Sequence, residues 1–255
     1  MVWIIDLDGV MWLSGEPIPG SAEAVGRLRE AGERVIFMTN NSSPRVADVL
    51  GQLAEAGVEA EEHDLATSSQ AAALLMHEGE TALVCGDEGV REALEKRGVR
   101  TVSEGDADAV VVGFHRSFDF DRLTAAFRAV HGGARLIGTN DDVTYPTPEG
   151  PMPGGGSLLA AVATAAGVEP EVAGKPHDAM AQLLRERVKG TVEGGVLVGD
   201  RPSTDGLMAR RLDMRFALVF SGVTSEDDLP VEPAPDITAP DLKTIVGPNG
   251  EVAEA

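Results

Sequence analysis

VWIIDLDGV, residues 2–10, is a short apolar run that ends in two aspartates separated by one residue and followed by a glycine. A run of this length and composition predicts a buried strand. Two carboxylates at the end of a buried strand repel each other unless a positive charge lies between them. Asp6 and Asp8 therefore point to a function at the end of this strand.

Apolar runs of the same kind recur along the chain and alternate with helical stretches. After the first run they are RVIFMTN (34–40), TALVCG (81–86), DAVVVGF (108–114), RLIGTN (135–140), GVLVGD (195–200) and RFALVFSG (215–222). Such alternation predicts an α/β fold with parallel sheets. In open parallel sheets, ligands bind beyond the carboxyl ends of the strands.

Composition limits the class of protein. The 255 residues are 43% hydrophobic, enough for one large domain or two modest ones. The sequence shows no long apolar run and no secretory signal, so we expect a cytoplasmic protein without membrane association. The 42 acidic and 21 basic residues give a net charge of −21, which argues against nucleic-acid binding. The single Cys85 cannot form an internal disulfide and is expected to be a small core residue.

Polar groups end several of the predicted strands. Thr39, Asn40 and Asn41 end the second run, and Asp200 ends the run at 195–200 with Asp205 five residues later. Converging carboxylates imply a cation, and a set of oxygen ligands favours Mg²⁺. A hydroxyl, backbone N–H groups before a helix and the Lys175 ammonium would suit a phosphoryl group.

A D-x-D triplet alone is weak evidence, because an aspartate after a strand is usually a turn or N-cap residue. Four separate polar motifs in a fixed order, each at the end of a predicted strand or at the start of a helix, are much less expected by chance. Together they resemble the motifs of the HAD-like (haloacid dehalogenase superfamily) hydrolases, class IIA, which includes nitrophenylphosphatase-like and NagD-like proteins. The four motifs are DLDGV at 6–10, TNNS at 39–42, GKP at 174–176 and GDRPSTD at 199–205.

The resemblance implies a Rossmann-like three-layer core with a mostly parallel sheet, formed by residues 1–78 and 174–255. It also implies an α/β cap domain inserted at 79–173, because TNDDVTYPTPEGPMPGGGSLLAA at 139–161 is similar to the cap signature of this branch. Tyr145 occupies the specificity-loop position of the family, although an ordinary loop aromatic is an alternative reading. Relatives often form homodimers through the cap.

The resemblance also implies a role for each site residue. Asp6 would be the nucleophile and Asp8 the general acid and base. Asp6, the carbonyl of Asp8 and Asp200 would hold Mg²⁺, with Asp205 orienting a water on the metal. The phosphate of a small phosphorylated metabolite would be bound by a set of neighbouring groups, namely Thr39, the backbone N–H of Asn40, Asn41 and Lys175.

The implied activity is hydrolysis of a small-molecule phosphomonoester through an aspartyl-phosphate. Two alternatives stay open at this point: a phosphotransferase that uses the same intermediate, and a non-catalytic binding protein on the same fold. Two features depart from the family pattern, namely His115 where relatives carry an acidic residue, and Pro202–Ser203 in the fourth motif.

Overall fold

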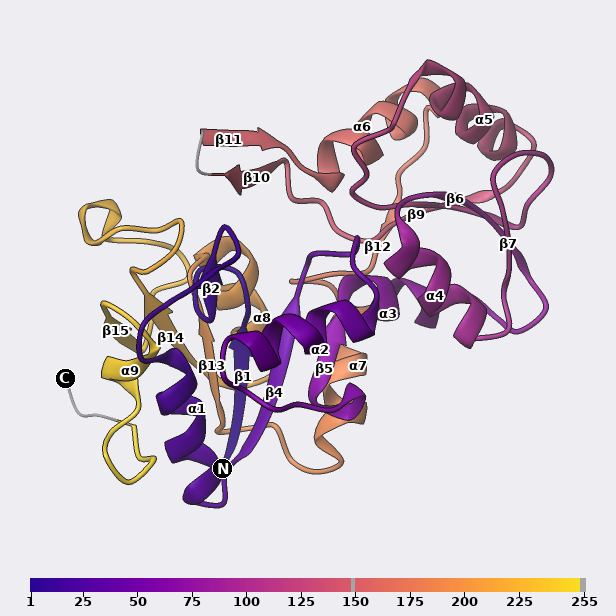
Figure 1. Ribbon diagram of the computed structural model, residues 1–255. Helices are drawn as coiled ribbons and strands as arrows, with labels where there is room; N and C mark the ends of the chain where they lie inside the picture. The colour runs from indigo at the N-terminus through magenta and orange to yellow at the C-terminus, as the bar shows by residue number, and fades with distance from the viewer. Residues whose placement is uncertain (148–149, 253–255) are drawn as a thin grey trace. The chain divides into compact units, whose positions relative to one another are not determined.

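The computed structural model describes residues 1–147 and 150–252 (Figure 1). Contacts within the chain divide it into two units. Unit 1 comprises Met1–Thr39, Asp48–Ala66 and Leu184–Ala255, and unit 2 comprises Asn40–Ala47 and Thr67–Leu183. The sequence-based division, with a core at 1–78 and 174–255 and a cap at 79–173, stays a prediction.

Unit 1 is built on a six-stranded sheet in which β1 occupies a central place. The sheet order is β15 (Ile237–Ala239), β14 (Arg215–Val219), β13 (Val196–Gly199), β1 (Val2–Asp6), β4 (Arg34–Thr39) and β5 (Leu65–Thr67). The strands β1, β4, β13, β14 and β15 pair in parallel. β1 lies between β13 and β4, so the strands of this sheet that follow it directly in the chain lie on one side of it and the later strands lie on the other. Doubly wound folds bind ligands in the crevice at such a reversal of strand order.

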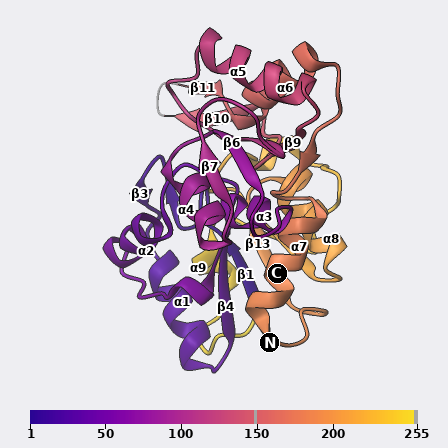
Figure 2. The same cartoon turned by 90° about the vertical axis from the view of Figure 1, so that its right-hand side faces the viewer.

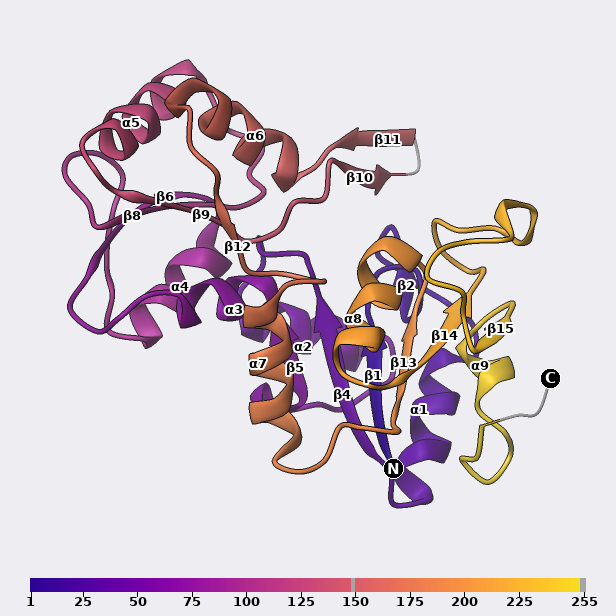
Figure 3. The ribbon, with the colours of Figure 1, turned by 180° about the vertical axis from the view of Figure 1, so that it is seen from behind.

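The apolar run that opens the chain is fully inside. Trp3, Ile4 and Ile5 are 0% exposed, as expected for a parallel strand that is covered on both faces. Helix α1 (Ser21–Glu30) lies in front of the strands in Figure 1, and α8 (Leu207–Arg211) lies in front of them in Figure 3, where the view is from behind. The remaining helices that include residues of this unit are α2 (Val46–Glu55), α7 (Asp178–Val188) and α9 (Leu242–Ile245).

Unit 2 contains a five-stranded parallel sheet. Its order is β12 (Glu171–Val172), β9 (Arg135–Gly138), β8 (Ala109–Val112), β6 (Thr81–Cys85) and β7 (Arg100–Val102). Helices α5 (Phe120–His131) and α6 (Gly155–Ala166) pack on one side of these strands, and α3 (Ser68–Leu74) and α4 (Glu88–Lys96) pack on the other (Figure 2). The whole sheet comes between β5 and β13 in the chain, so it is an insertion. The predicted α/β fold with an inserted α/β part is confirmed.

Two short hairpins complete the fold. One is β2 (Trp12–Leu13) with β3 (Glu16–Pro17), and the other is β10 (Thr144–Thr147) with β11 (Gly150–Pro153). Residues 148–149 of the predicted cap signature lie outside the described residues. Cys85 is buried in β6, and burial raises the pKa of its thiol to about 11, which fits the predicted role as a core residue. Over residues 1–147 and 150–252, no helix is long and apolar enough to cross a membrane.

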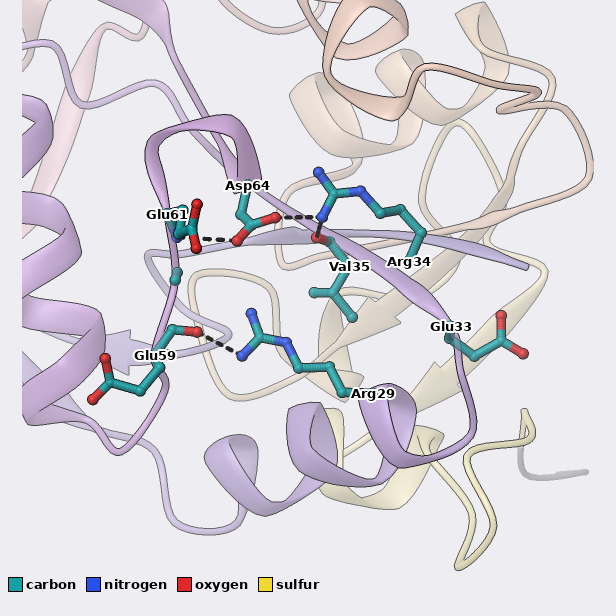
Figure 4. A pocket seen from close by; sticks show the side chains of 8 residues that line it. Arg29, Glu33, Arg34, Val35, Glu59, Glu61 and Asp64 are labelled. Carbon is teal, nitrogen blue, oxygen red and sulfur yellow. Dashed lines mark hydrogen bonds and ion pairs between the residues drawn. The ribbon is translucent and has the colours of Figure 1, made fainter.

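The amino ends of β4 and β5 are joined by an ion pair. Arg34 opens β4, Asp64 immediately precedes β5, and the guanidinium of Arg34 contacts the Asp64 carboxylate (Figure 4). The N–H of Glu61 donates to the other oxygen of Asp64 at 3.0 Å. Burial tends to raise the pKa of Asp64, but the hydrogen bonds from Arg34 and Glu61 outweigh it, so the pKa lies below its ordinary value of 3.8. The folded state therefore favours the ionised carboxylate.

Asp64→Asn is expected to lower the free energy of unfolding at pH 7 by about 1–3 kcal/mol, because it leaves Arg34 without its charged partner. A folded-state pKa below the unfolded value means that this stabilisation is present above the unfolded pKa and is lost as pH falls through the folded pKa. Urea unfolding should show a gap between wild type and variant that shrinks with acidification below about pH 4. The exposed Glu59 is the matched control, since Arg29 bonds its carbonyl and Glu59→Gln keeps that contact. A gap that is unchanged down to pH 2 would contradict the assignment.

Candidate active site

Three buried carboxylates meet at the carboxyl edge of the unit 1 sheet. Asp6 is the last residue of β1, Asp200 directly follows β13, and Asp205 lies in the π-helical turn Pro202–Gly206. They are 4%, 2% and 0% exposed, and one oxygen from each lies within 4.8 Å of the other two. Since β1 and β13 are parallel neighbours, their carboxyl ends must meet at this edge. The structure thus brings together three of the predicted site residues.

The backbone holds the two later aspartates in place. The N–H of Val223 donates to Asp200 Oδ2 at 2.7 Å, and the N–H of Arg201 donates to Asp205 Oδ2 at 3.0 Å. Both carboxylates are therefore oriented by backbone amide donors. These contacts fix where the negative charge lies at the edge of the sheet.

Two glycines make room for Asp200. A Cβ on Gly222 would lie 2.0 Å from Asp200 Oδ2, and a Cβ on Gly9 would lie 2.4 Å from the same atom. Gly9 also has a φ of +85°, a left-handed conformation that favours glycine. The glycine of the DLDGV motif therefore permits both the turn after Asp8 and the close approach of Asp200.

Asp8 and Thr39 lie together in unit 1. The indole N–H of Trp12 donates to Asp8 Oδ1 at 3.2 Å, and the hydroxyl of Thr39 donates to Asp8 Oδ2 at 3.4 Å. Thr39 ends β4, the neighbour of β1, and is 2% exposed. Asp8 is half-buried, with both carboxylate oxygens engaged by uncharged donors.

Asn40 and Lys175 lie together in unit 2. Both are buried, at 8% and 3% exposed. The side-chain oxygen of Asn40 accepts from the Lys175 N–H at 2.8 Å, and its amide nitrogen donates to the Lys175 carbonyl at 3.2 Å. Asn41 Oδ1 accepts from the N–H of Ser43 at 3.1 Å, which makes a local turn. The second and third motifs are therefore directly connected.

Tyr145 lies on the β10–β11 hairpin of unit 2. Its ring stacks on Phe114, with centroids 5.8 Å apart and planes at 29°. Met152 is its partner across the hairpin. His115, next to Phe114, is 4% exposed, and burial lowers the pKa of its imidazole. Helix α6 begins at Gly155, and a Cβ on Gly156 would lie 2.3 Å from the Asp141 carbonyl oxygen.

Several residues around the site escaped the sequence reasoning. Three contacts were not predicted. The Trp12 indole donates to Asp8, Gly222 lies close to Asp200, and the Asn40 side chain contacts the Lys175 backbone. The run FSGVTSEDDL carried Gly222 and Val223, but nothing in its residue types marks them as neighbours of an aspartate. Only the fold brings them to it.

The three carboxylates fit a hard divalent cation. All three donors are carboxylate oxygens, which Mg²⁺ and Ca²⁺ prefer and which Zn²⁺ sites rarely use alone. Three charges so close together in a buried site are strongly unfavourable without a counter-ion. A parallel α/β sheet with such a group at its carboxyl edge defines a Rossmann-like fold with an acidic site suited to a cation.

Comparison with known proteins narrows this class. A family model described as haloacid dehalogenase-like hydrolase matches residues 3–100, and one described as HAD-hydrolase-like matches 172–245. The 5'-nucleotidase YutF of Bacillus subtilis (strain 168) is 35% identical over 231 residues, which cover 89% of this chain and 90% of the relative. The chain therefore belongs to the haloacid dehalogenase-like hydrolases, in the class IIA branch of NagD-like and p-nitrophenyl phosphatases.

Solved structures agree with this assignment. A p-nitrophenyl phosphatase from Archaeoglobus fulgidus is similar with a TM-score of 0.88 and 31% identity, covering 95% of this chain and 96% of that one. A glycerol phosphate phosphatase from Mycobacterium tuberculosis, in complex with magnesium, is similar with a TM-score of 0.86 and 33% identity, covering 95% of this chain and 75% of that one. The chain is thus a HAD-like phosphatase by family.

Proposed function

We propose that this protein hydrolyses the phosphomonoester of a small metabolite, with Mg²⁺ as its cofactor and an aspartyl-phosphate as its intermediate. The observation that carries the proposal is the buried group of Asp6, Asp200 and Asp205 at the carboxyl edge of a parallel sheet. The mutual repulsion of such a group favours a bound cation. A cation held by carboxylates leaves its remaining positions for water and for phosphate oxygens.

The proposed reaction has two steps. A carboxylate oxygen of Asp6 attacks phosphorus, the bond from phosphorus to the ester oxygen breaks, and Asp8 gives its proton to the departing alcohol. Asp8 then takes a proton from water, whose oxygen attacks the phosphorus of the aspartyl-phosphate. Inorganic phosphate leaves and the Asp6 carboxylate is restored. The contacts of Asp8 with Trp12 and Thr39 support a fixed orientation for this proton transfer.

The remaining site residues bind charge. We propose that the Thr39 hydroxyl, the backbone N–H of Asn40 and the Asn41 amide bind the phosphoryl oxygens, and that Lys175 neutralises phosphate. Asp6, Asp200 and the Asp8 carbonyl would hold Mg²⁺, with Asp205 orienting a water on the metal. When bound, the ion offsets the negative charge of carboxylates and phosphate.

Phosphate release from p-nitrophenyl phosphate and from a panel of sugar, glycerol and nucleoside phosphates tests the proposal. Release should require Mg²⁺, and chelation should lower the rate by more than about 100-fold, with recovery when the ion is restored. A rate that survives exhaustive chelation would remove the metal from the proposal. Adding acceptor alcohols separates hydrolysis from transfer, because a phosphotransferase releases less free phosphate.

The substrate is proposed only as a class. Relatives are named 5'-nucleotidase, D-glycerol 3-phosphate phosphatase and acid sugar phosphatase, so small hydroxylated phosphate esters are the compounds to screen first. Tyr145→Ala should change the order of preference within that panel if the hairpin contacts the leaving group, and it should leave the order unchanged if Tyr145 is an ordinary loop aromatic.

Light scattering on the intact protein tests the expected homodimer through residues 79–173.

Gly222→Ala is expected to raise the Mg²⁺ concentration needed for half-maximal rate by at least about tenfold. The new Cβ would lie 2.0 Å from Asp200 Oδ2 and 2.5 Å from its Cγ, so the carboxylate must move. A Mg²⁺ titration of the initial rate measures the shift. Gly51→Ala is the matched control, because nothing lies within 4 Å of its Cβ and α2 should gain about 1 kcal/mol of stability. Equal Mg²⁺ dependence in wild type and Gly222→Ala would contradict the role of this contact.

A further inference from the structure

The side chain of Asn40 grips the backbone of Lys175 from two sides. Its oxygen accepts from the Lys175 N–H at 2.8 Å, and its nitrogen donates to the Lys175 carbonyl at 3.2 Å. The same nitrogen donates to Asp142 Oδ2 at 2.9 Å. An amide nitrogen has two N–H donors, so both are used here. The Asn40 side chain is therefore committed to protein groups, which leaves its backbone N–H as the part suited to bind phosphate.

Asn40 is itself held by neighbours in unit 2. Its carbonyl accepts from Asn140 Nδ2 and from the Ser68 hydroxyl, each at 2.7 Å. The N–H of Asp142 donates to Asn140 Oδ1 at 3.2 Å, which closes a small network. Asn40, Asn140 and Ser68 are at most 8% exposed. Hydrogen bonds that are buried and mutually supporting fix one conformation, because breaking any of them leaves a polar group unsatisfied.

Gly174, the residue before Lys175, is closely packed against Asn40 and Thr139. A Cβ on Gly174 would lie 2.5 Å from Asn40 Oδ1 and 2.6 Å from the Thr139 carbonyl oxygen. The Gly174 N–H donates to that same carbonyl at 2.8 Å. The glycine of the GKP motif thus allows Asn40 to reach the backbone of the next residue.

We propose that Asn40, through its side chain, is the positioning residue for Lys175. The inference rests on the proposed function, in which the Lys175 ammonium neutralises phosphate charge. The position of the Lys175 ammonium depends on the position of its backbone. A misplacement of about 1 Å can lower the rate on the order of 100-fold. The two hydrogen bonds between the Asn40 side chain and the Lys175 backbone, called the clamp below, connect Lys175 to the residue whose own N–H is proposed to bind the same phosphate.

The test is a double-mutant cycle of Asn40→Ala and Lys175→Met. Asn40→Ala keeps the backbone N–H and should lower kcat by about 10- to 100-fold, with KM changed by less than about threefold. In the Lys175→Met background, the same change should cost less than about threefold, because nothing is left to position. Equal losses in the two backgrounds would overturn the proposal.

A matched control removes a hydrogen bond of the same kind in the same part of unit 2. The Thr139 hydroxyl donates to Ser42 Oγ at 3.0 Å, and both residues are 0% exposed. Thr139→Val should leave kcat within about twofold of wild type, although it costs about 1 kcal/mol of stability. A loss of kcat as large as that of Asn40→Ala would show a general packing effect and would overturn the proposal.

Amide hydrogen exchange tests the clamp without any activity. The Lys175 N–H should exchange at least about tenfold faster in Asn40→Ala, since its acceptor is gone. If Asn40→Ala does not fold, Asn40→Asp serves in its place, because it keeps the acceptor but sets a carboxylate against Asp142 and the Lys175 carbonyl; it should lower kcat at least about tenfold. Unchanged exchange in Asn40→Ala, or an Asn40→Asp as active as wild type, would overturn the clamp. A wild type that releases no phosphate would instead sink the proposed function, while the exchange result would still stand.

Discussion

Asp6→Asn is expected to abolish phosphate release, with a loss in kcat on the order of 10⁴-fold or more. The carboxylate proposed to attack phosphorus is replaced by an amide, which is a far weaker nucleophile, so the covalent route would be closed. The fold should persist, because asparagine has the same shape and removes one of three mutually repelling charges. Initial rates with p-nitrophenyl phosphate, together with circular dichroism, measure both effects.

Asp213→Asn is the matched control, because it makes the same chemical change at an exposed position of unit 1. It should retain wild-type activity. Trapping by acid quench and intact-mass measurement should detect a phosphorylated wild-type chain and an unmodified Asp6→Asn chain. Retention of more than about a tenth of the activity in Asp6→Asn would remove it from the role of nucleophile.

Lys175→Met is expected to lower kcat by about 100- to 1,000-fold, the usual cost of losing one preorganised charge at the reacting group. Methionine follows the length of the lysine stem, so the 3% exposed position stays filled. The affinity for inorganic phosphate as a product inhibitor should fall in parallel, since the lost charge is the one proposed to contact phosphate. Steady-state kinetics and inhibition by phosphate measure the two quantities.

Lys175→Arg should not restore the rate, because a planar guanidinium cannot replace a compact ammonium in a close-fitting site. Thermal unfolding is the control for folding, because removing one buried charge leaves its partner uncompensated and can lower stability. Wild-type kcat and unchanged phosphate inhibition in Lys175→Met would show that this lysine does not act on phosphate.

The sequence supported a large part of this description because strand and helix patterns are local. The run at 2–6 is buried as expected, and the predicted strands at 34–40, 81–86, 108–114, 135–140, 195–200 and 215–222 all form. The ends of those strands carried Asp6 and Asp200, and the parallel fold class alone requires such ends to face one edge of a sheet. The resemblance to the phosphatase family then gave each motif a chemical role.

Contacts between particular side chains could not be predicted from the sequence. Trp12 was an unremarked aromatic until its indole was found on Asp8, and Gly222 was an ordinary glycine until its closeness to Asp200 was seen. Asn40 was expected to bind phosphate through its backbone N–H, which stays a prediction, and its side chain contacts Lys175, 135 positions away. A pairing across such a separation depends on how the whole chain folds, which no local pattern encodes.

By itself, then, the sequence determined the class of fold, the family and the residues that carry charge, because these follow from local periodicity and from short motifs. Only the tertiary structure decided that Asp6, Asp200 and Asp205 share one buried point, and that a single amide side chain holds the Lys175 backbone. The physical reason is that electrostatic and hydrogen-bond energies depend on distances of a few ångströms. Those distances are set by the packing of segments far apart in the chain.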